Sequence, residues 1–118
     1  DLQAQRLEGG ERVFERIARL AAGPWNRNGR LGLVVGATFP DEIAQVRALA
    51  PTLPLLIPGV GAQGGDAAAT VKAGLRDNGP IIVNSSRAIL YASSGVDFAD
   101  AARREALRTR DTLQAARA

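Results

Sequence analysis

Three short apolar runs, each followed by residues with helical spacing, constrain the fold of this chain more than any other feature. The runs occupy residues 31–37, 53–57 and 81–84. Helical patterns occupy residues 8–22, 40–50, 66–75 and 97–116, with a short helical turn at 88–92. Runs of this length suit strands better than helices, because helices in globular proteins need about ten residues or more. The predicted order is therefore one helix followed by three strand–helix units.

Strands that are apolar along their whole length, alternating with helices, predict a parallel sheet that is covered on both faces. Their spacing suits the βα units of a barrel or of an open doubly wound sheet. Three strands alone would leave bare edges, so we expect this α/β chain to be part of a longer protein. In the last helix, the residues predicted to face inward are Ala99, Ala102, Ala106, Leu113 and Ala116.

The composition excludes several kinds of chemistry within the chain. Its 118 residues contain no Cys, His or Met, so disulfides, the usual zinc sites and a Ser–His–Asp triad are excluded. No apolar run reaches the roughly 18–20 residues that cross a bilayer, and the first residues lack a signal peptide's layout. We therefore expect a cytoplasmic protein without a membrane partner.

The net charge of +3 does not by itself indicate a nucleic-acid partner. Of the 15 basic residues only Lys72 is a lysine, and most of the arginines lie among carboxylates on the predicted helices. Aromatic residues make up only 4% of the chain. This mixture favours a solvated charged surface over a nucleic-acid site.

The densest functional signal is the string PGVGAQGGD at residues 58–66, between the second strand and its helix. Four glycines in such a loop allow close approach of a ligand and direct backbone N–H groups at an anion. A tight turn alone would need fewer glycines. Gly59, Gly61 and Gly64 also match the dinucleotide pattern GxGxxG, but the next strand does not end in the acidic residue that this pattern requires.

A second anion-binding signal follows the third strand, at Asn84-Ser85-Ser86-Arg87. Free N–H groups at a helix start, a hydroxyl and an arginine together suit a phosphate dianion. A capping serine beside a surface arginine is the simpler alternative. In (β/α)8 barrels, however, the loops after the last two strands commonly hold a phosphate beside a short extra helix, which residues 88–92 would provide.

These motifs resemble the orotidine 5′-phosphate decarboxylase family. The resemblance rests on LLIPGVGAQGGD at residues 55–66, IIVNSSRAILYA at 81–92 and VVGAT at 34–38. It is closest to the longer bacterial type found in actinobacteria and relatives, and it covers essentially the whole chain. It implies that residues 1–118 are the C-terminal part of a single (β/α)8 TIM-barrel domain, namely the last three βα units and the helix before them.

The resemblance also implies which residues bind the substrate: Pro58, Val60, Gly61, Gln63, Gly64, Ser86 and Arg87. Gln63 would hydrogen-bond both the phosphate and the pyrimidine, and Arg87 would pair with the phosphate beside the backbone N–H groups of Ser86 and Arg87. Pro58 and Val60 would help to wall the base pocket. Related sequences often have glycine where this one has Ser86.

The reaction implied by the resemblance is loss of CO2 from orotidine 5′-phosphate to give UMP in pyrimidine biosynthesis, without a metal or organic cofactor. In this family, loss of CO2 passes through a carbanion-like state that a lysine protonates. That lysine belongs to a Lys/Asp motif in the first half of the barrel, and one Asp comes from across a homodimer interface. This chain lacks that motif, and Lys72 is expected to be a surface residue. No catalytic residue is therefore expected here, and the implied partners are the N-terminal part of the barrel and a second subunit.

Two alternatives remain open at the level of sequence. The chain could be a phosphate-binding half-barrel without catalysis. It could also belong to another sugar-phosphate TIM-barrel enzyme, such as an aldolase or epimerase.

Overall fold

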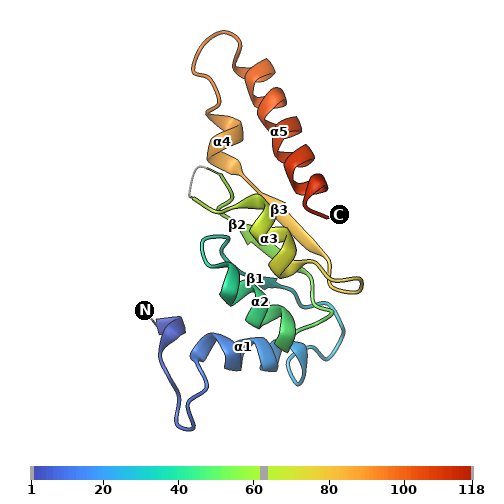
Figure 1. Cartoon of the computed structure of the whole chain (residues 1–118). Helices are drawn as coiled ribbons and strands as arrows, with labels where there is room; N and C mark the ends of the chain where they lie inside the picture. Colours follow the sequence, from blue (N-terminus) through green and yellow to red (C-terminus); the bar gives the residue numbers. More distant parts are fainter. Residues whose placement is uncertain (1, 62–63, 118) are drawn as a thin grey trace.

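The computed structural model describes residues 2–61 and 64–117 and contains the predicted α-βα-βα-βα order (Figure 1). The elements are the 3-10 helix η1 (Leu2–Ala4), α1 (Val13–Ala22), β1 (Leu33–Val34), α2 (Pro40–Leu49), β2 (Leu55–Pro58), α3 (Ala67–Gly74), β3 (Ile81–Asn84), α4 (Ser86–Leu90) and α5 (Phe98–Ala115). No helix in the described ranges is both long and apolar enough to span a bilayer.

The three strands form one parallel sheet in the order β1-β2-β3. Leu33 pairs with Leu55, and Leu55 pairs with Ile81. β1 is much shorter than the apolar run at 31–37, although its hydrogen bonds to the β2 segment continue as far as Ala37, whose N–H donates to the Pro58 carbonyl (2.8 Å). Parallel strands linked by helices are the arrangement that the alternating pattern predicts.

The helices cover one face of the sheet. Leu55 and Ile57 of β2 are completely buried on this side, against Ile43 and Val46 of α2. Ala18 of α1 extends this core. At about 25 cal/mol per Å² of apolar surface removed from water, burial of these side chains is the main term that stabilises the layer.

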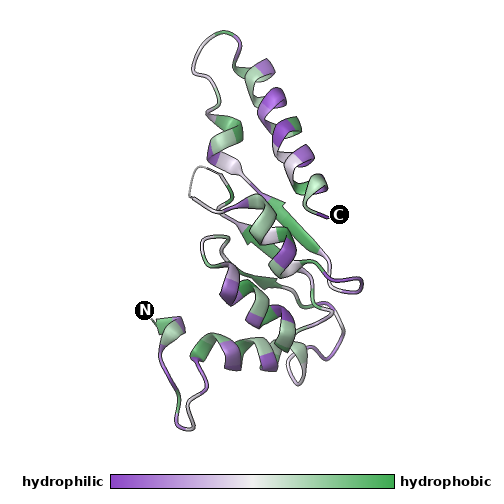
Figure 2. Cartoon of the chain, in the orientation of Figure 1, coloured by the Kyte–Doolittle hydropathy of each residue, from purple (hydrophilic) through white to green (hydrophobic). Residues whose placement is uncertain are grey.

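The described residues leave the opposite face of the sheet uncovered, so the expectation of a sheet covered on both faces is wrong for this chain. Val34, Leu56 and Ile82 lie side by side in the register of the three strands and expose 69%, 38% and 62% of their surface. Figure 2 shows the hydrophobic colouring along β3. Because side chains alternate between faces along a strand, the continuous apolar runs supply one buried face and one exposed face here.

Three helix predictions also need correction. The first helix begins at Val13, not at residue 8, because Gly9 and Gly10 adopt positive φ angles of 96° and 90° in a turn ahead of it. In α5, Ala101 is the buried residue and Ala99 is exposed, so the stripe predicted for this helix is shifted at its start. The short helix begins at Ser86 instead of residue 88.

Arg47 of α2 ties the elements together at the amino ends of the strands. Its side chain is buried, and its guanidinium donates hydrogen bonds to six backbone carbonyls. The acceptors are Gly74 (2.6 Å), Ala50 (3.0 Å), Pro51 (3.3 Å), Leu53 (2.7 Å), Gly79 (3.0 Å) and Pro80 (3.1 Å). Burial lowers the pKa of Arg47, and the nearby charge of Arg76 lowers it further. The amino ends of the strands are therefore held together by Arg47, and the loops described next lie at the opposite end of the sheet.

Candidate phosphate-binding site

Two loops lie next to one another at the carboxyl ends of β2 and β3. Pro58 and Asn84 are paired in the register of these strands, so the segments that follow them leave the sheet side by side. In α/β proteins with parallel strands, ligands bind at this end of the sheet. The geometry therefore brings the two predicted anion-binding motifs together.

The glycine-rich loop folds back on the end of β2. Gly59, Gly61 and Gly64 have φ angles of 98°, 81° and 88°, which residues with a Cβ atom rarely adopt. The N–H of Gly65 donates to the Gly59 carbonyl (3.1 Å), and the N–H of Gly61 donates to the Gly65 carbonyl (3.1 Å). A Cβ on Gly65 would lie 2.6 Å from the Ala37 Cβ, so glycine is required there for packing.

The helix after this loop begins at a defined cap. The Asp66 carboxylate accepts a hydrogen bond from the backbone N–H of Ala69 (2.6 Å), which satisfies one free donor of the first turn. The predicted start of this helix is therefore confirmed to within one residue. Lys72, on the same helix, is exposed, as expected.

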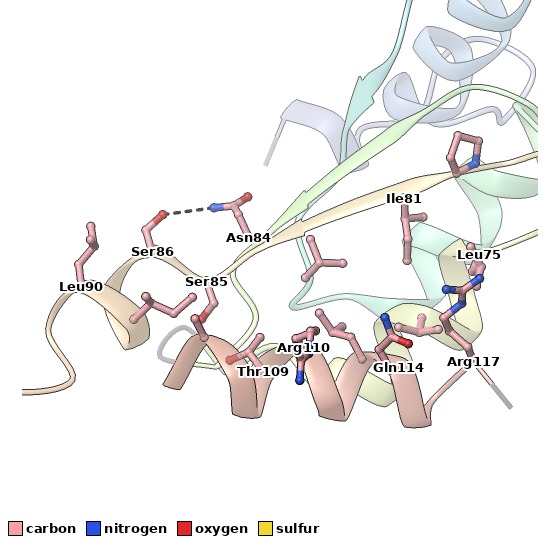
Figure 3. A pocket seen from close by; sticks show the side chains of 16 residues that line it. Leu75, Ile81, Asn84, Ser85, Ser86, Leu90, Thr109, Arg110, Gln114 and Arg117 are labelled. Carbon is pink, nitrogen blue, oxygen red and sulfur yellow. Dashed lines mark hydrogen bonds between the residues drawn. The ribbon is translucent and has the colours of Figure 1, made fainter. Parts of the chain in front are cut away.

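The second loop is joined to the first by a buried serine. The Ser85 hydroxyl donates to the Val60 carbonyl at 2.8 Å, and Ser85 exposes only 6% of its surface. The Asn84 amide donates to the Ser86 hydroxyl at 3.3 Å (Figure 3). Asn84 lies on the same face of β3 as Ile82, because side chains two residues apart on a strand share a face.

A small cavity of about 70 Å³ lies between the loops. Its lining residues are Pro58, Gly59, Val60, Asn84, Ser85, Ser86 and Arg87. Pockets that hold a whole drug-sized ligand usually measure about 300–1,000 Å³, so this volume suits one small group at the end of a ligand. Arg87 is exposed at its rim and has no carboxylate partner among residues 2–61 and 64–117.

The structure brings four of the predicted binding residues to this cavity: Pro58, Val60, Ser86 and Arg87. Gly61 and Gly64 lie in the loop above it without lining it, and Gln63 lies outside the described residues. Sequence reasoning included Ser85 in the second motif but missed its contact with the first loop. The roles of all seven residues stay predictions.

A larger cavity of about 730 Å³ lies between β3, α3, α4 and α5 (Figure 3). Its walls include Leu75, Ile81 and Leu113, and it meets the small cavity only at Asn84, Ser85 and Ser86. Figure 3 shows Ile81 and Asn84 on opposite sides of β3. The larger cavity therefore lies on the helix-covered side of the sheet, away from the mouth of the paired loops.

The parallel sheet, its helical layer and the two loops at its carboxyl edge are those of part of a (β/α)8 barrel. Along its whole length, the chain is similar to the C-terminal portion of orotidine 5′-phosphate decarboxylases. It is 78% identical over 121 residues to the orotidine 5′-phosphate decarboxylase of Polaromonas naphthalenivorans, covering all of this chain and 43% of that relative. It is 72% identical over 120 residues to the enzyme of Paracidovorax citrulli, covering 99% of this chain and 44% of that relative.

Solved structures agree with this similarity. The Leishmania donovani UMP synthase is 43% identical with a TM-score of 0.78, over 96% of this chain and 25% of that one. The Leishmania donovani OMP decarboxylase is 39% identical with a TM-score of 0.76, over 97% of this chain and 43% of that one. No protein-family model matches the chain. The chain thus spans less than half the length of the curated relatives named above.

Proposed function

We propose that this chain is the phosphate-binding part of an orotidine 5′-phosphate decarboxylase, which converts orotidine 5′-phosphate to UMP and CO2 in pyrimidine biosynthesis. The observation that carries the proposal is the pairing of Pro58 with Asn84, which sets the glycine-rich loop beside the Ser86–Arg87 segment around one small cavity. The similarity to named decarboxylases supports the choice of substrate. Residues 1–118 then form the C-terminal part of one barrel domain.

In this proposal, the chain binds the phosphate end of the substrate. The Arg87 guanidinium pairs with the phosphate oxygens, and the backbone N–H groups of Ser86 and Arg87 donate to them. Gln63 reaches from its loop toward the phosphate and the pyrimidine, while Pro58 and Val60 wall the base pocket. Gly61 and Gly64 supply the backbone conformation that lets the loop approach the ligand.

The proton donor lies outside this chain in the proposal. A Lys/Asp motif in the first half of the barrel, with an Asp from the second subunit of a homodimer, performs the acid–base step without a metal or organic cofactor. Phosphate binding still contributes to the rate, because binding energy from a remote group can be used to orient and distort the reacting part of the substrate. The enzyme acts in the cytoplasm.

The test is a decarboxylation assay of the full-length product of the gene that encodes this chain, with release of CO2 as the readout, beside a titration with UMP. Turnover of orotidine 5′-phosphate supports the proposal. Binding of UMP without turnover would indicate a non-catalytic phosphate-binding half-barrel. Neither turnover nor binding would indicate another sugar-phosphate barrel enzyme.

A further inference from the structure

We infer that Ser85 is a positioning residue that holds the glycine-rich loop in the arrangement that binds phosphate. The inference rests on the proposed function, since it assigns a role within the same site. It starts from the hydrogen bond that the Ser85 hydroxyl donates to the Val60 carbonyl, which joins residues 25 positions apart in the chain.

This hydrogen bond is the one described polar contact between the two loops. Among the described residues, the other backbone bonds of the glycine-rich loop run within it or back to Gly59 at the end of β2. Among residues 2–61 and 64–117, only the Ser85 hydroxyl joins the segment 59–65 to the segment 84–88. When this hydrogen bond is removed, only packing contacts among the described residues keep the two loops at their observed spacing.

The packing around Ser85 shows that the loop rests directly on this side chain. A Cβ placed on Gly61 would lie 3.2 Å from the Ser85 hydroxyl oxygen and 3.6 Å from the Ala88 Cβ. Ser85 and Val60 each expose only 6% of their surface, so water does not readily replace the hydroxyl as a donor. Leaving a buried carbonyl without a donor destabilises this arrangement of the loop, because the carbonyl loses its hydrogen bond without regaining water. The loop is then favoured to move toward solvent.

The glycines make such a tie necessary. Gly59, Gly61 and Gly64 all have positive φ, and glycine has more conformational freedom than any other residue. A site made from two loops binds a phosphate well only when both are held near the binding geometry beforehand. Ser85 therefore supports phosphate binding without touching the phosphate.

The experiment uses the full-length gene product with the variants Ser85→Ala and Ser85→Cys. Alanine removes the donor, whereas cysteine keeps a similar size and a weak S–H donor. The exposed Ser94, in the loop after α4, provides the matched control as Ser94→Ala. Two properties are measured: hydrogen exchange at the Gly61 and Gly65 amides, and the affinity for UMP and for its phosphate-free counterpart, uridine.

We expect Ser85→Ala to speed hydrogen exchange at both amides and to lower the affinity for UMP about tenfold. The affinity for uridine should change less than twofold. Ser85→Cys should fall between Ser85→Ala and the parent protein, and Ser94→Ala should match the parent. Equal weakening of UMP and uridine would reduce Ser85 to a general structural role and overturn the inference. Unchanged exchange, or faster exchange with unchanged UMP affinity, would also overturn it.

The outcome for the parent protein separates this inference from the proposed function. A parent that turns over orotidine 5′-phosphate while Ser85→Ala behaves identically refutes the role of Ser85 alone. A parent that neither binds UMP nor turns over the substrate refutes the proposed function, and with it the phosphate role of Ser85.

Discussion

At the scale of single residues, the site contrasts one buried polar group with one free charge. Ser85 is buried and satisfied by the Val60 carbonyl, whereas Arg87 is exposed without an ion-pair partner in the described part of the chain. By contrast, most of the arginines that do form ion pairs lie on α1 and α5, and their partners include Glu11, just before α1, and Glu105 of α5. A free guanidinium at the rim of a small cavity is suited to a doubly charged ligand group.

Arg87→Ala should therefore weaken a phosphate-bearing ligand strongly. A hydrogen bond to a charged group is worth about 1.5–3 kcal/mol, which corresponds to roughly a 10- to 150-fold loss of affinity for UMP. Affinity for uridine should stay within about twofold, because uridine carries no phosphate. Isothermal titration of the full-length gene product measures both affinities.

Arg103→Ala on α5, which removes another exposed arginine, serves as the control. Equal losses of affinity for UMP and uridine in Arg87→Ala would place Arg87 outside the phosphate site.

At the scale of secondary-structure elements, the start of α1 has one half of a capping box, in which the Glu15 side chain reaches back to the residue before the helix. The Glu15 carboxylate accepts a hydrogen bond from the backbone N–H of Arg12 at 2.7 Å and lies 3.5 Å from its guanidinium. The bond from the Arg12 backbone is the main cause of a lowered pKa of Glu15, and the Arg12 side chain lowers it further. A carboxylate at this position satisfies a free donor and interacts well with the helix dipole.

This arrangement predicts a pH dependence of stability. Because the pKa of Glu15 is lower in the folded state than in the unfolded state, ionised Glu15 stabilises the fold above its unfolded pKa of about 4.3. That contribution is lost as the pH falls through the folded pKa. Glu15→Gln keeps the hydrogen-bond acceptor without the charge, so its Tm should lie below that of the parent at pH 7 and approach it as the pH falls through the folded pKa of Glu15. A gap in Tm that stays constant from pH 7 to pH 3 would contradict this assignment.

At the other end of the sheet, Arg47 joins α2 to α3 and to the segments that lead into β2 and β3, and its removal should affect the whole fold. Arg47→Met keeps much of the side-chain volume but leaves the carbonyls of Leu53, Gly74 and Gly79 without their charged donor. Since hydrogen bonds to charged groups are worth about 1.5–3 kcal/mol each, we expect a loss of about 3 kcal/mol or more in the free energy of unfolding. Urea unfolding measures this loss, and Arg103→Met on the surface of α5 should change it by less than about 0.5 kcal/mol.

The elements also show which parts of the fold the sequence could predict. α2, α3 and β3 match their predicted ranges to within one residue, because Pro40, Asp66 and an unbroken apolar run mark their starts. The predicted start of α1 was wrong. Glu8 and Arg12 have helical spacing, but the turn at Gly9 and Gly10 lies between them. For the site, the two motifs predicted which loops would meet.

The contact that joins those loops lies beyond sequence reasoning. The Ser85 hydroxyl bonds to a backbone carbonyl, and every residue has one, so no residue type marks Val60 as its partner. The ion pairs illustrate the same limit. Glu15 and Arg19 are four residues apart, which is the spacing of a helical ion pair, but Glu15 contacts Arg12 and Arg19 contacts Glu11 (2.7 Å). Long side chains choose among several neighbours within reach, and only their three-dimensional placement decides.

At the scale of the whole molecule, the uncovered sheet face is the feature that most clearly distinguishes this chain from a self-contained domain. The row of Val34, Leu56 and Ile82 is apolar and exposed, and in the described part of the chain each outer strand has an unpaired edge. An apolar surface of this kind favours association with another surface that removes it from water. In the proposed barrel, this face points into the barrel interior, and inward-facing side chains of the remaining strands cover it.

The substitution Ile82→Ser tests this by its different effect in two lengths of the protein. In the 118-residue chain alone, Ile82 is already exposed, so the free energy of unfolding should change by less than about 0.5 kcal/mol, and self-association should decrease. In the full-length gene product, where the proposal buries Ile82 inside the barrel, the same change should cost about 2 kcal/mol or more. Urea unfolding and sedimentation velocity measure these effects. Val96→Ser, in a fully exposed loop position, is the control for both lengths. A small effect of Ile82→Ser in both lengths would mean that the face stays open, and the barrel assignment of residues 1–118 would then be wrong.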